Sequence, residues 1–64
     1  MRAWKVGEKV NFVVNEWDTV GTLITQCVIT EVHNDYAVAT ELYGGEHPMR
    51  LLIDDDTEDM FRKA

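Results

Sequence analysis

The chain contains a single cysteine and a single proline among its 64 residues. One cysteine cannot form an internal disulfide bond, and Cys27, His33 and His47 lack the paired spacing of a structural zinc site. Cys27 lies in a stretch rich in β-branched residues, without a nearby Lys, Arg or His that would activate its thiol. We therefore expect a small buried side chain at Cys27, and neither a metal site nor a catalytic thiol.

Long apolar runs are also missing. The longest uncharged stretch has about a dozen residues and includes Thr and Gln, whereas a membrane-spanning helix needs about 20 apolar residues. The first nine residues include Arg2, Lys5, Glu8 and Lys9 and lack the apolar segment of a secretory signal. We expect a cytoplasmic protein with no membrane partner.

Basic residues are scarce, and their distribution is uneven. Twelve acidic residues against six Lys and Arg give a formal net charge of −6. No Lys or Arg lies between Lys9 and Arg50, a stretch that contains six of the acids: Glu16, Asp18, Glu31, Asp35, Glu41 and Glu46. Because such a surface repels phosphates, we expect a protein partner with a basic surface and no direct binding of nucleic acid.

The chain length limits what the fold can contain. A domain of this size buries only about 60% of its unfolded surface, so the core is thin. The hydrophobic fraction of 45% is nevertheless too high for a disordered acidic tail. We expect one domain over residues 1–64. A surface this small excludes water poorly, which argues against an enzyme and against a cofactor.

Alternation of apolar and polar residues predicts four strands, over residues 5–15, 20–33, 36–43 and 49–53. The second of these changes phase, which predicts a bend or bulge near Thr25 and Gln26. Asn34 with Asp35, and Gly44 with Gly45, are typical turn pairs; the first pair tolerates positive φ. Trp4, ahead of the first strand, is expected in the core or covering its edge.

The acidic tail, residues 54–63, predicts a short helical turn. Acids at its start and bases at its end suit the helix dipole, and Asp55 with Glu58 has the spacing of a capping box. Met60 and Phe61 would then cover an open end of the fold.

The segments 5–10, 20–24 and 37–40 together resemble the layout of SH3-like small barrels, including Tudor and KOW-type domains. The shared features are the Gly7-Glu8 start before the first strand and Gly21 at the beginning of a long curved second strand. Four or five short strands with tight turns predict a small antiparallel barrel or a curled sheet. The resemblance implies an all-β fold, a small SH3-like antiparallel barrel of four to five strands with a short C-terminal helical turn. Many unrelated functions share this architecture.

Trp17, between Glu16 and Asp18, lies in a polar stretch where a core residue is unusual. An exposed Trp flanked by acids is typical of a binding anchor, because its ring attracts cations. The alternative is that this loop folds back and the indole covers the end of the barrel.

Tyr36, beside Asp35, and Tyr43 fall at predicted turns. The Tudor resemblance implies that they could join Trp17 in an aromatic cage for methylated Lys or Arg; the alternative is ordinary packing at strand ends.

Asp54, Asp55 and Asp56 begin an acidic run that fails the calcium-loop pattern, because Asp59 stands where an EF-hand requires glycine. Three interpretations of these acids stay open: they favour the helix start and solubility, they form a phosphate-like surface, or they form a weak surface site for Mg²⁺.

The leading hypothesis is a small acidic, non-enzymatic protein-binding module. Its Trp-containing acidic surface would dock on a basic, nucleic-acid-handling host protein, and the compact acidic chain resembles inhibitory accessory proteins of bacterial viruses. Two alternatives stay open: a structural subunit, including a homodimer, and a Tudor-like or SH3-like peptide reader.

Overall fold

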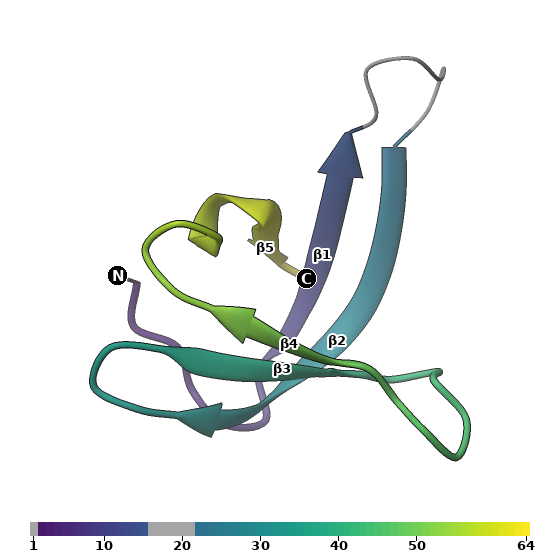
Figure 1. Ribbon diagram of the computed structural model, residues 1–64, viewed down its shortest axis with the longest axis horizontal. Helices are drawn as coiled ribbons and strands as arrows, with labels where there is room; N and C mark the ends of the chain where they lie inside the picture. Colours follow the sequence, from purple (N-terminus) through teal and green to yellow (C-terminus); the bar gives the residue numbers. More distant parts are fainter. Residues whose placement is uncertain (1, 16–21) are drawn as a thin grey trace.

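A computed structural model describes residues 2–15 and 22–64 of the chain. Its strands form one antiparallel sheet in the order β4-β3-β2-β1-β5 (Figure 1). The elements are β1 (Lys9–Asn15), β2 (Thr22–Val32), β3 (Ala37–Glu41), β4 (Arg50–Ile53), the 3-10 turn η1 (Glu58–Met60) and β5 (Phe61–Lys63). The predicted all-β antiparallel class is confirmed. Within the described ranges, no helix is long and apolar enough to cross a membrane.

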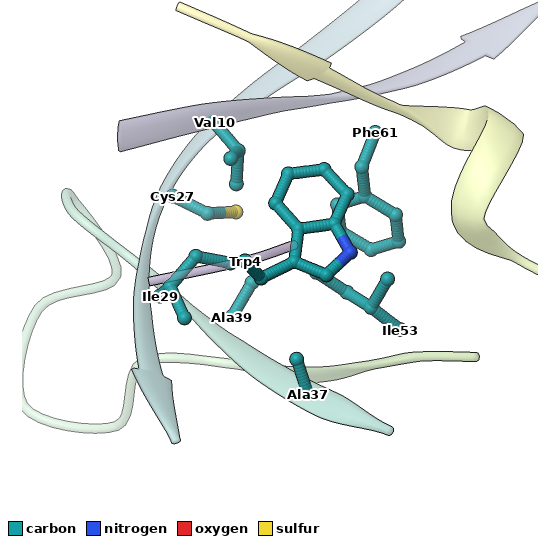
Figure 2. Close-up of a cluster of buried hydrophobic side chains, with 8 residues drawn as sticks. All are labelled: Trp4, Val10, Cys27, Ile29, Ala37, Ala39, Ile53 and Phe61. Atoms are coloured by element: carbon teal, nitrogen blue, oxygen red, sulfur yellow. The ribbon is translucent and has the colours of Figure 1, made fainter. Parts of the chain in front are cut away.

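The sheet is not closed into a barrel, and in this respect the prediction was wrong. β4 and β5 are the two edges of the sheet. The indole of Trp4 lies among side chains of both edge strands, next to Ile53 of β4 and Phe61 of β5 (Figure 2). A side chain from the N-terminal segment thus fills the space that direct pairing of the edges would otherwise close.

Eight buried side chains form the core on the concave side of the sheet (Figure 2): Trp4, Val10, Cys27, Ile29, Ala37, Ala39, Ile53 and Phe61. The expected burial of Trp4 and Cys27 is confirmed. The two alanines of β3 contribute only methyl groups to the core, which leaves room for the large indole. Phe12, partly buried, packs on Phe61 with ring centroids 5.0 Å apart.

The chain enters β1 through a tight turn rather than through the predicted strand. The N–H of Glu8 donates to the carbonyl of Lys5 over 3.1 Å, and Gly7 has a φ of 91°, a conformation that favours glycine. Val6, expected on the buried face of a strand, is 67% exposed.

The irregularity of β2 lies four to five residues later than predicted. The β1–β2 register runs without a break through Thr25 and Gln26, while the β2–β3 register shifts between Ile29 and Glu31. Thr30 is therefore the extra residue. Its hydroxyl lies 2.9 Å from that of Thr40 on β3. After the extra residue, Val32 pairs with Ala37, which explains the phase change only for the end of the strand.

The two predicted loop turns are present, although the first uses no positive φ: among the described residues, only glycines have one. His33 donates its backbone N–H to the carbonyl of Tyr36, which closes the β2–β3 turn around Asn34 and Asp35. Gly45 has a φ of 68° in the β3–β4 loop.

The predicted C-terminal helical turn is the three-residue η1, and an unexpected strand, β5, follows it. Reciprocal hydrogen bonds join Asp54 and Thr57 in the turn before η1, instead of the predicted pair Asp55 and Glu58, and Thr57, the N-cap of η1, makes no side-chain capping hydrogen bond. Asp54 Oδ1 accepts the N–H of Thr57 over 3.0 Å, and Thr57 Oγ1 accepts the N–H of Asp54 over 2.9 Å. Phe61 covers the core as expected.

Candidate binding surfaces

Two loops from distant parts of the sequence meet at one end of the sheet. Ala37, the first residue of β3, pairs with Ile53, the last residue of β4. The turn that precedes β3 and the turn that follows β4 therefore start from the same end of the sheet, and from there the chain after β4 turns toward η1 (Figure 1). We call this region the acidic end and define it by five residues that the sequence singled out: Asp35, Tyr36, Asp54, Asp55 and Asp56.

Local hydrogen bonds fix the backbone of the acidic end. Asp54 Oδ1 accepts the N–H of Asp56 over 2.9 Å as well as that of Thr57, so the Asp54 carboxylate has a structural role. The ring of Tyr36 stacks on that of His33, with centroids 4.3 Å apart and planes 19° from parallel. Asp35, Asp55 and Asp56 are exposed. The backbone of residues 54–57 and the half-buried ring of Tyr36 are thus held in place.

Three basic residues of the described chain pair with acids outside this set. Arg2 pairs with Glu58 over 3.4 Å, Arg50 pairs with Glu31, and Lys63 lies 3.5 Å from Glu8. Neither loop of the acidic end, residues 33–36 and 54–57, contains Lys or Arg. The acidic end is accordingly a concentrated source of negative potential.

The aromatic cage implied by the Tudor resemblance is not formed by the two tyrosines. Tyr36 precedes β3 and Tyr43 follows it, so the length of the strand separates them by roughly 20 Å. Trp17, with Glu16 and Asp18, lies outside the described residues, and its function as an anchor stays a prediction. Tyr43 is 83% exposed.

A hollow of about 350 Å³ lies at the Tyr43 end of β3, and the sequence did not indicate it. Leu42 donates its N–H to the carbonyl of Gln26 over 3.0 Å, after which the chain turns away from β2. The residues around the hollow are Ile24, Thr25, Gln26, Glu41 and Tyr43. Glu41 is held in place because its Oε1 accepts the N–H of Met49 over 2.7 Å. The mismatch in length between β2 and β3 creates this hollow.

Cys27 lies beneath the sheet, and its Sγ is 3.6 Å from the carbonyl of Thr25. Burial raises the pKa of the Cys27 thiol, and the charge of Glu41 adds to the shift. Such a thiol is a poor nucleophile. Across the part of the chain that the structure describes, no group of three or more His, Cys, Asp or Glu side chains is arranged to hold a metal ion.

Comparison with models of protein families, with curated proteins and with solved structures finds no match to this chain.

Proposed function

We propose that the chain is a small acidic, non-enzymatic protein-binding module that docks on the basic surface of a nucleic-acid-handling protein. The observation that supports this most is the pairing of Ala37 with Ile53, because the loop that contains Asp35 and the loop that contains Asp54–Asp56 then start from the same end of the sheet. A dense group of carboxylates offers a basic groove the charge pattern it normally receives from phosphates.

Charge and contact area have separate functions in this proposal. Long-range attraction speeds the encounter with a basic partner and steers its orientation. Tyr36 supplies an aromatic contact that stacking on His33 has already ordered, so little side-chain entropy is lost on binding. Glu16, Trp17 and Asp18 are proposed as additional contacts. Because the module occupies a surface that nucleic acid needs, binding would inhibit the partner, as an accessory protein of viral origin would do.

The test measures the fluorescence anisotropy of a labelled ten-residue oligolysine and of a labelled DNA duplex. We expect oligolysine to bind, more weakly as salt rises, and DNA not to bind. Asp35→Asn and Asp56→Asn should each reduce oligolysine affinity about twofold, the effect of one exposed ion pair. Glu46→Gln removes the same charge from the β3–β4 loop and is the matched control. Equal losses in all three variants, or binding of the duplex, would contradict the proposal.

A second candidate function is a subunit of a homo-oligomer. β4 is an edge strand, and its Leu52 side chain is 52% exposed, which offers both backbone groups and apolar area to another copy. Sedimentation velocity over a wide concentration range tests this directly. A strictly monomeric chain would remove the homodimer.

A further inference from the structure

β2 extends well beyond the strand that covers its side. It has eleven residues, whereas β3 has five, and β3 pairs with β2 only from Cys27 onward. Before that point, no described strand lies along this side of β2. We call residues 23–26 the open edge of β2.

Backbone groups at the open edge point away from β1. The carbonyl of Gln26 points toward the β3 side, since it accepts the N–H of Leu42. In an antiparallel ladder alternate residues point to the same neighbour, so the N–H and C=O of Ile24 also face this side. The carbonyl of Gln26 is already engaged with Leu42, and the N–H and C=O of Ile24 are a template for an added strand.

The side chains around the open edge differ between its two faces. Thr25 lies two residues before Cys27, the partner of Glu41, so Thr25 and Glu41 share one face of the sheet. Ile24, 59% exposed, lies on the opposite face. Tyr43 flanks the hollow, which is lined by a carboxylate and by no Lys or Arg.

We propose that an extended, basic segment of a partner protein adds to the open edge of β2 as an antiparallel strand, in line with β3. Its Lys or Arg side chains would lie on the face of Glu41 and its aliphatic side chains on the face of Ile24. Charge selects this occupant over a second copy, because every copy carries −6. The surface shares no residue with the acidic end.

The probe is an end-blocked seven-residue peptide in which Lys and Val alternate, compared with a peptide of the same composition whose lysines and valines are grouped. Amide hydrogen exchange of the full chain, followed by NMR, is the readout. The alternating peptide should protect the amides of Ile24 and Gln26 and leave those of Leu23 and Thr25 unchanged, since the latter face β1. Protection by both peptides alike would overturn the proposal.

Variants identify the side chains. Glu41→Gln keeps the oxygen that accepts the Met49 N–H and should weaken the alternating peptide about threefold, the range of an exposed ion pair. Ile24→Lys should weaken it about tenfold, because an apolar contact becomes a like-charge contact. Glu46→Gln is the matched control and should have a smaller effect than Glu41→Gln.

Two further outcomes would also overturn the proposal. The first is unchanged affinity for the alternating peptide in both Glu41→Gln and Ile24→Lys. The second is exchange protection that increases with protein concentration in the absence of peptide, because a second copy would then be the occupant. Asp35→Asn and Asp56→Asn should leave the protection of Ile24 and Gln26 intact. Failure at the open edge is therefore distinguishable from failure at the acidic end.

Discussion

The acidic end and the open edge of β2 lie at opposite ends of β3 and are built differently. At the acidic end, loops are fixed by the Asp54–Thr57 contacts and by the stacked rings of Tyr36 and His33. At the open edge, β1 and β2 extend away from the rest of the sheet (Figure 1), and Leu23 and Ile24 are exposed on opposite faces. The acidic end therefore offers charged side chains on loops that are fixed by local contacts, and the open edge offers backbone N–H and C=O groups. Binding at both ends should weaken as salt rises, but only binding at the open edge should protect backbone amides from exchange.

The largest expected effect comes from truncating Trp4, whose ring packs in the core with Ile53, the residue that precedes the acidic end. Trp4→Ala empties the space beside Ile53 and Phe61 and should lower the free energy of unfolding by about 3 to 5 kcal/mol. Urea denaturation followed by circular dichroism measures this. Val6→Ala, at a side chain that is 67% exposed, should cost less than about 0.5 kcal/mol.

Trp4→Phe sharpens this measurement. Within the described structure the buried Nε1 of Trp4 has no hydrogen-bond partner, so its removal leaves no acceptor unsatisfied. We expect Trp4→Phe to be clearly less destabilising than Trp4→Ala. Equal losses in the two variants would contradict the packing role of the ring.

A smaller effect should separate the structural carboxylate of the acidic end from the exposed ones. Asp54→Ala removes the acceptor of two backbone N–H groups and should cost about 1 kcal/mol. Asp56→Ala makes the same change of charge at an exposed side chain and should be nearly neutral. Thermal or urea unfolding compares the two variants. Equal stabilities would show that the hydrogen bonds to the Asp54 carboxylate contribute nothing.

The smallest effect concerns Cys27, a buried residue of β2, the strand that carries the open edge. Because burial and then Glu41 raise the pKa of its thiol above the ordinary 9.0, the unfolded chain releases this proton before the folded chain does. The contribution of Cys27 to stability is thus complete below pH 9 and is lost as pH rises above it. Urea midpoints at pH 8 and pH 10 should fall more in the wild type than in Cys27→Ala. Parallel falls would contradict the shift.

Local patterns in the sequence predicted much of the sheet, because alternation and turn residues act over a few positions. The two glycine or Asx turns and the burial of Cys27 follow from such patterns. β5 was missed because Phe61–Lys63 becomes a strand only through pairing with Val10–Phe12, nearly fifty residues away. The bulge was misplaced because a phase change shows that an extra residue exists but does not locate it.

Each acid of the acidic end was recognised singly, while their convergence was not. A signal was available: the third and fourth predicted strands are neighbours joined by a short loop, and a hairpin between them places residue 36 beside residue 54. The open edge could not be predicted, because it depends on β3 ending at Glu41 instead of the expected residue 43.

A single NMR titration tests most directly whether the chain has two separate binding surfaces. Amide spectra of the isotope-labelled chain would be recorded with oligolysine and, separately, with the alternating Lys and Val peptide. We predict that oligolysine shifts Asp35, Tyr36 and Asp54–Asp56 in a salt-sensitive manner, and that the alternating peptide shifts and protects Ile24 and Gln26. One common set of shifted residues for both probes, or a uniform response to both, would contradict the account.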